Sequence, residues 1–169
     1  MTGPARSLLA RIPFGDERRL QLQIVHPALI GLIDGTLSTL APVFAAAYIS
    51  GSRAALVIGL AAALGAAISM GLSEGLSDDG TLTGRGTSLT RGMITGVATF
   101  VGGAAHTLPF LIDDVDRALT VAYVMVAVEL VLIGWIRKRF QRVGFAQSLV
   151  QVTIGGAVIA AVGIALGHA

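Results

Sequence analysis

Residues 31–42, Gly-Leu-Ile-Asp-Gly-Thr-Leu-Ser-Thr-Leu-Ala-Pro, decide the fold class, because they place one carboxylate, Asp34, inside an apolar run that continues to Ser50. A charge at bilayer depth costs at least about 3 kcal/mol, so an ionisable residue there usually faces the protein interior or a water-filled cavity. Gly35 lets another helix approach closely, and Pro42 removes one helical hydrogen bond. The stretch therefore predicts a membrane-spanning helix that carries a functional acid.

The composition is that of an integral membrane protein. Of 169 residues, 54% are hydrophobic and 13% are charged, and the mean hydropathy is +0.79. Soluble domains carry about 25% charged residues. The basic residues form short clusters between apolar runs, so they indicate topology, and we expect no nucleic-acid partner. The chain has no cysteine, which excludes disulfides and thiolate metal sites. It also lacks the Gly-Lys-Ser/Thr ending of a nucleotide-binding loop, and we expect neither an enzyme nor a bound cofactor.

Five apolar runs reach the length of roughly 17 to 25 residues that a helix needs to span a bilayer. They are continuous, and their Ala and Leu content favours helices over the strands of a barrel. Since the connectors are short, we predict an all-α membrane protein, a compact bundle of five transmembrane helices over residues 24–169. The predicted spans are residues 27–50, 54–76, 92–112, 118–136 and 143–167.

The first 23 residues form a basic segment that mixes apolar residues with arginines. A short interfacial helix and a basic tail are both consistent with this pattern. Because the segment lacks the apolar core of a signal peptide, we expect it to remain in the mature protein. All but two of the 12 Lys and Arg residues, Arg53 and Arg117, fall on the same side of the five spans as the N-terminus. The excess of positive charge predicts a cytoplasmic N-terminus.

Polar groups on three spans fall at one predicted depth. With a rise of 1.5 Å per residue, Asp34 and Glu129 lie about 10–12 Å from the cytoplasmic ends of their spans, and Met70 lies about 9–10 Å from its end. Glu74 lies one turn nearer the cytoplasm. We therefore predict a metal site formed by Asp34, Met70, Glu74 and Glu129. Oxygen ligands suit Mg²⁺, Ca²⁺ or Mn²⁺, and the thioether favours a later metal such as Fe²⁺.

Each of these residues has a structural alternative. Asp34 is also consistent with a buried acid bonded to nearby hydroxyls, and Glu129 with an ion pair to the basic end of its own span. Met70 is also typical of a flexible core residue, and Glu74 of a membrane-surface charge. His106, about 21 Å along the third span, is either a proton carrier or a packed histidine.

Small residues recur at a spacing of four, which lets helices approach closely in lipid. We take the pairs as a prediction of tight packing and of a homodimer. They are Gly31 with Gly35, Gly71 with Gly75, Gly92 with Gly96, and Gly163 with Gly167.

Three motifs resemble the vacuolar iron transporter family, whose members are five-span dimers that exchange Fe²⁺ for protons. These are Asp-Gly-Thr-Leu-Ser-Thr at 34–39, Ala-Ile-Ser-Met-Gly-Leu-Ser-Glu at 67–74, and Gly-Gly at 102–103 with Leu-Pro-Phe at 108–110. The closer likeness is to the membrane domain of bacterial membrane-bound ferritin-like iron exporters, and it covers residues 24–167. The ferritin-like domain of those exporters has no counterpart in residues 1–23.

The resemblance implies that Asp34 and Met70 are the intramembrane ion-site residues and that Glu74 is the acid following the Ser-Met pair. Glu129 is supported by its depth alone. We predict a homodimeric exporter of Fe²⁺, with Mn²⁺ as a second cargo, in a bacterial inner membrane. Metal binding displaces protons from carboxylates, which couples the two fluxes. The alternatives are a non-transporting membrane scaffold that recruits a ferritin-like partner and a passive divalent cation channel.

Overall fold

The computed structural model describes residues 17–80, 83–141 and 143–168, and every regular element in these ranges is a helix. This confirms the predicted all-α class. The elements are α2 (Glu17–Leu20), the π-helical turn η1 (Gln21–Val25), α3 (His26–Ser50), α4 (Ser52–Ser77), α5 (Ser88–Ala105), the 3-10 turn η2 (Leu108–Leu111), α6 (Val115–Gln141) and α7 (Phe145–Gly167).

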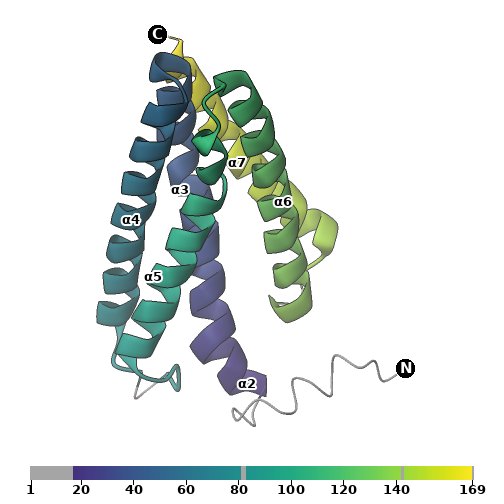
Figure 1. Ribbon diagram of the computed structural model, residues 1–169. Coiled ribbons are helices and arrows are strands. Elements are labelled where there is room, and N and C mark those ends of the chain that lie inside the picture. Colours follow the sequence, from purple (N-terminus) through teal and green to yellow (C-terminus); the bar gives the residue numbers. More distant parts are fainter. Residues whose placement is uncertain (1–16, 81–82, 142, 169) are drawn as a thin grey trace.

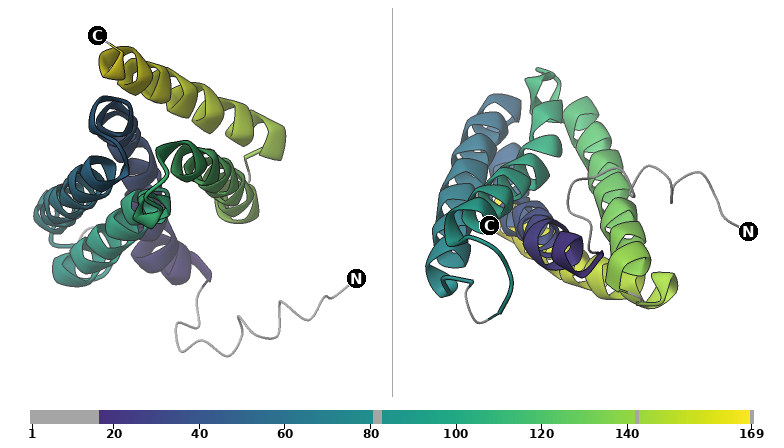
Figure 2. Two further views of the ribbon diagram at one scale, coloured as in Figure 1. Left: turned by 45° about the horizontal axis from the view of Figure 1, so that its top comes forward. Right: turned by 90° about the horizontal axis from the view of Figure 1, so that it is seen from below.

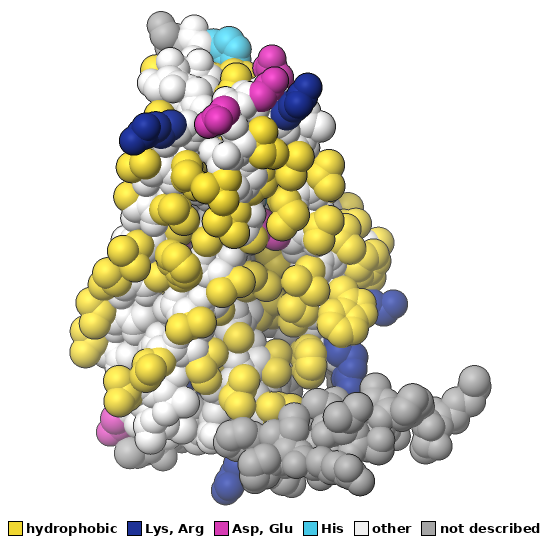
Figure 3. Space-filling view, viewed as in Figure 1, with side chains coloured by type: hydrophobic (Ala, Val, Ile, Leu, Met, Phe, Trp, Pro, Cys, Tyr) yellow, Lys and Arg dark blue, Asp and Glu magenta, His cyan; other side chains and the backbone are white. Residues whose placement is uncertain are grey.

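Four helical segments are long and apolar enough to cross a membrane. They are Arg18–Ser50, Ser52–Ser77, Val115–Gln141 and Phe145–Gly167. Figure 3 shows the matching surface, a broad apolar belt with charged side chains gathered toward its two ends. An exposed apolar surface of this size is typical of contact with lipid, so the chain is an integral membrane protein.

The helix α3 is the centre of the bundle. It packs against α4 and α5 on one side and against α6 and α7 on the other (Figures 1 and 2). At its N-terminal end α3 continues without a break into η1 and α2. Pro27 cannot donate to the carbonyl of Gln23, and the preceding turn is π-helical, with the His26 N–H bonded to the Gln21 carbonyl. The predicted domain boundary at residues 23 and 24 therefore falls inside a helix, and residues 1–16 lie outside the described ranges.

The predicted third span was wrong in its bounds, since α5 begins and ends earlier than residues 92–112. Thr87 caps its start by accepting a hydrogen bond from the Thr90 N–H at 3.4 Å. Pro109 cannot continue an α-helix, and the chain turns into η2. The sequence of α5 includes Arg91 and several Thr and Gly residues, and α5 is not among the four most apolar segments. It is nevertheless packed against both α3 and α4.

The predicted glycine pairs are used for packing inside the chain. A methyl group on Gly35 would overlap the carbonyl oxygen of Thr99 in α5, and one on Gly92 would lie 2.6 Å from the carbonyl oxygen of Gly71. Gly163 lies equally close to Ala41 in α3. Close helix contacts of this kind need a residue without a side chain. The pairs confirm the tight packing, and they give no separate support to a homodimer.

Candidate functional site

Asp34 lies on α3 with its side chain partly exposed. None of the described residues forms a hydrogen bond or an ion pair with it. Leu37, one turn further along the same face, packs against Gly156 of α7. Ser38, which follows Leu37 and lies one turn from Asp34, is exposed. The acid is thus neither sealed in the core nor neutralised by a neighbouring base.

Met70 lies on α4 and is also partly exposed, next to Gly71, which packs on α5. Within the described ranges, no three His, Asp or Glu side chains come close enough together to hold a metal ion. The acids among the four predicted ligands therefore do not form one cluster within a single chain.

Glu129 is buried in the centre of the bundle, where it meets a histidine. Its Oε2 atom lies 3.0 Å from Nδ1 of His106, and Nε2 of His106 lies 2.8 Å from the hydroxyl oxygen of Thr39. Thr39 in turn donates its hydroxyl proton to the carbonyl oxygen of Gly35 at 2.8 Å. The chain of hydrogen bonds joins α6, the end of α5 and α3.

Thr39 has a single O–H, so its bonds to Gly35 and His106 are linked. When this O–H donates to the carbonyl of Gly35, the oxygen of Thr39 accepts from the Nε2–H of His106. The contact between Nδ1 and Glu129 then needs one more proton, carried either by the imidazolium or by the carboxylic acid. Both arrangements leave the pair with no net charge, which a buried site favours. The second oxygen of Glu129, Oε1, is buried and accepts no hydrogen bond from a described residue.

The hydrogen bonds of Glu129 do not lead to Asp34. Glu129 is joined through the imidazole of His106 to Thr39 of α3, which lies five residues beyond Asp34, about 7.5 Å further along the helix and on a different side of it. The helix α6 continues to Gln141, so Glu129 lies near its middle. The alternative pairing with the basic end of α6 is also absent, because Glu129 bonds to His106.

Glu74 at the end of α4 is held by two arginines. Its Oε1 atom lies 2.6 Å from Arg85 and 2.8 Å from Nε of Arg91. Asp78 completes the group, 3.1 Å from Arg85 and 3.3 Å from Arg91. Two acids and two bases balance one another, so Glu74 is not a free carboxylate in this conformation.

Arg91 anchors the connector between α4 and α5. Its side chain is 0% exposed, and it donates to the carbonyl oxygens of Gly86 and Asp78, each at 2.8 Å. The sequence placed Arg91 in a connector, but it lies inside α5. Partial burial raises the pKa of Asp78, but the Gly80 N–H, Arg91, Arg85 and Thr83 lower it by more, so its pKa lies below the ordinary value.

The contacts between these residues were not predicted from the sequence. His106 and Glu129 were predicted separately, and Glu74 was not connected with Arg85 and Arg91. The second connection had a usable signal, because three acids and two bases lie close together in the sequence between residues 74 and 91. The first had none, since a histidine and a glutamate on separate spans give no spacing pattern.

Comparison with known proteins gives one match. The model of the VIT family matches residues 75–168, which run from the end of α4 through α7. This part contains Arg91, His106 and Glu129, whereas Asp34 and Met70 precede it. Neither the search of curated proteins nor that of solved structures gave a match.

Proposed function

The chain belongs to the VIT family, the vacuolar iron transporters, which carry metal ions across membranes, and from this premise we propose that it exports Fe²⁺ from the cytoplasm in exchange for protons. Mn²⁺ is the second cargo that the same ligands would accept. The proposed membrane is a bacterial inner membrane, with the N-terminus on the cytoplasmic side.

The main support for the proposal is the environment of Asp34. It is a partly exposed carboxylate within the apolar span Arg18–Ser50, and it has no partner among the described residues. Such a charge is costly unless a cation or water attends it. We assign the metal to Asp34 and the thioether of Met70. The remaining ligands would be water or groups from a second copy of the chain, in line with the dimer that the family resemblance implies.

The pair of Glu129 and His106 is the proposed proton carrier. It holds one shared proton at zero net charge, and Glu129 keeps a buried oxygen free for a second. Proton binding here and metal binding at Asp34 would alternate if the helices that carry them shift between two arrangements. The coupling requires α3, because it carries Asp34 and also Thr39, which bonds to His106.

Glu74 is the proposed receiving residue for the metal at the cytoplasmic end. Both arginines contact one oxygen of Glu74, Oε1, so the departure of Arg85 would make this carboxylate more available to a cation. Arg85 is the partly exposed member of the pair and Arg91 is the buried one. We therefore propose that the side chain of Arg85 moves away when the metal arrives, while that of Arg91 stays in place.

The test is metal uptake into proteoliposomes under an imposed pH gradient, with a metal-sensitive dye inside. We expect Asp34→Asn to lower the Fe²⁺ flux at least about tenfold, which corresponds to a transport barrier raised by about 1.4 kcal/mol. Ser38→Ala, one turn away on the same helix and exposed, is the matched control and should transport normally. Equal flux from Asp34→Asn and the wild type would exclude this mechanism.

The same assay separates the alternatives. A scaffold that only recruits a partner would give no flux in the wild type. A passive channel would give flux that ignores the pH gradient and does not saturate with metal. Only an exchanger shows both saturation and acceleration by an opposing proton gradient.

A further inference from the structure

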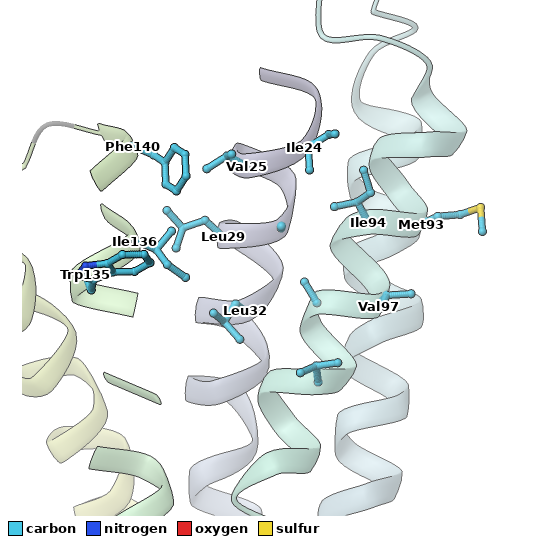
Figure 4. Close-up of a pocket in the computed structure, with 13 residues that line it drawn as sticks. Ile24, Val25, Leu29, Leu32, Met93, Ile94, Val97, Trp135, Ile136 and Phe140 are labelled. Atoms are coloured by element: carbon cyan, nitrogen blue, oxygen red, sulfur yellow. The ribbon is translucent and has the colours of Figure 1, made fainter. Parts of the chain in front are cut away.

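An apolar groove runs along one side of the bundle, between α5 and α6 (Figure 4). Its volume is about 720 Å³, which is in the range of ligand pockets. Leu29 and Leu32 of α3 line it together with Ile94 of α5 and with Trp135 and Phe140 of α6. Every residue that lines the groove has a hydrophobic or aromatic side chain. Neither a metal ion nor a polar substrate finds a ligand in it.

The groove exists because α5 and α6 are joined at only one end. The contact of His106 with Glu129 holds them there, and η2 packs against α6 nearby. Toward the other end the two helices diverge, as Figures 1 and 2 both show. Along its length α6 packs against α7 and α3. The groove therefore opens sideways within the apolar belt, where hydrocarbon chains of the bilayer can enter.

Positive charge surrounds the end of the groove nearest the membrane surface. The guanidinium of Arg139 lies 5.2 Å from the ring of Phe140, which itself lines the groove. Gln21 donates to the carbonyl oxygen of Phe140 at 2.7 Å and ties η1 to the end of α6. Lys138 is exposed, and its ammonium lies 5.9 Å from the ring of Phe145 at the start of α7. Neither Lys138 nor Arg139 forms an ion pair with a described acid.

The short helix α2, which precedes the groove residues of η1, is also basic. Arg18 and Arg19 in α2 are exposed and precede Ile24, a groove residue, by one to two helical turns. An apolar channel with cations at its mouth matches the two parts of a phospholipid, an acyl chain and a phosphate.

We infer that the groove binds one acyl chain of a phospholipid with an anionic head group, and that the head group lies beside Lys138 and Arg139. The lipid fills the space that α5 and α6 leave open. Each cation near an anionic lipid contributes about fivefold to binding. The site involves neither Asp34 nor Glu129, so it stands independently of the transport proposal.

The test uses the single tryptophan of the chain, Trp135, as a reporter, because it lines the groove and needs no substitution. The full chain is placed in phosphatidylcholine bilayers, and phosphatidylglycerol or phosphatidylcholine with brominated acyl chains is added as the quencher. We expect brominated phosphatidylglycerol to reach half of its quenching at a mole fraction at least about fivefold lower than brominated phosphatidylcholine.

Two sets of variants locate the effect. The double variant K138Q/R139Q should quench equally with the two lipids. Ala98→Phe, which fills the groove, should also lose the preference for phosphatidylglycerol. Ala157→Phe, on the exposed face of α7, is the matched control and should keep it. If Ala98→Phe does not fold, K138Q/R139Q alone decides, since its two side chains are exposed at the helix end.

Equal quenching of the wild type by the two lipids would overturn the inference. So would a second copy of the chain in the groove. Because the chain has no cysteine, Ala98→Cys gives a single thiol. Efficient disulfide cross-linking between two copies through this thiol in membranes would show protein in place of lipid.

Discussion

Nδ1 of His106, at the end of α5, lies 3.0 Å from Oε2 of Glu129, in the middle of α6. Thr39 orients the imidazole from the other side through Nε2 at 2.8 Å. The pair is buried between three helices. Under the proposed function, the gain or loss of a proton at this contact would be linked to the relative position of two helices.

Glu129→Gln should uncouple transport from the proton gradient. The amide cannot release a proton, so we expect Fe²⁺ flux to lose its response to the pH gradient, with a drop of at least about tenfold under an opposing gradient. Proteoliposome flux measured across a series of pH gradients checks this. Ser148→Ala removes another buried polar group, a hydroxyl without a partner, and should leave the pH response unchanged. A normal pH response in Glu129→Gln would contradict the assigned role.

Arg91→Gln should destabilise the fold. The variant removes one of the two arginines that pair with Glu74, and it leaves the carbonyl oxygens of Asp78 and Gly86 without this hydrogen-bond donor. Arg85 still pairs with Glu74 in this variant, so we expect a loss of about 1–3 kcal/mol, the cost of buried polar groups left without a partner. Unfolding in detergent, followed by circular dichroism, measures the loss. Arg117→Gln is the control, since its side chain is 81% exposed and its pair with Asp114 is worth about 1 kcal/mol or less. Similar losses in both variants would refute the anchoring role of Arg91.

Gly35→Ala should destabilise the packing of α3 on α5, because the added methyl group meets the Thr99 carbonyl. Overpacking of this kind costs about 1–3 kcal/mol. Gly65→Ala is matched to it, since that glycine lies within α4 and no heavy atom lies within 4 Å of the added methyl group. There the helix gains up to about 1 kcal/mol from the alanine. The two variants should shift the unfolding transition in opposite directions, and a shift in the same direction would disprove the close contact.

Asp78 makes the stability of the folded chain depend on pH in the acid range. Because its pKa is lower in the folded chain than in the unfolded one, it stabilises the fold fully above its ordinary pKa of about 3.9. The stabilisation is lost as the pH falls from that value through the lower pKa of the folded state. Thermal unfolding between pH 7 and pH 3 measures the effect.

Asp78→Asn should flatten the acid limb of this profile, whereas Asp113→Asn, in an exposed connector, should leave it unchanged. An acid limb as steep in Asp78→Asn as in the wild type would exclude Asp78 as its source.

The class of the protein and the number of its long helices follow from the amino-acid sequence alone. Runs of about 20 apolar residues have only one stable form in lipid, because each backbone group must be bonded within its own segment. Short connectors between the apolar runs then predicted a compact bundle. Three motifs resembled the family that the match over residues 75–168 shows. Asp34 was recognisable as unusual from its apolar surroundings alone.

Which polar groups come into contact could not be predicted without the packing of the helices. The depth of Glu129 depends on how far α6 continues beyond the apolar run, and basic residues there extend the helix to Gln141 without changing the hydropathy pattern of the span. Arg91 can lie inside α5 because Glu74 compensates its charge and two carbonyl oxygens accept its hydrogen bonds. Hydropathy depends on neighbours along the chain, whereas the pairing of His106 with Glu129 depends on how separate helices pack.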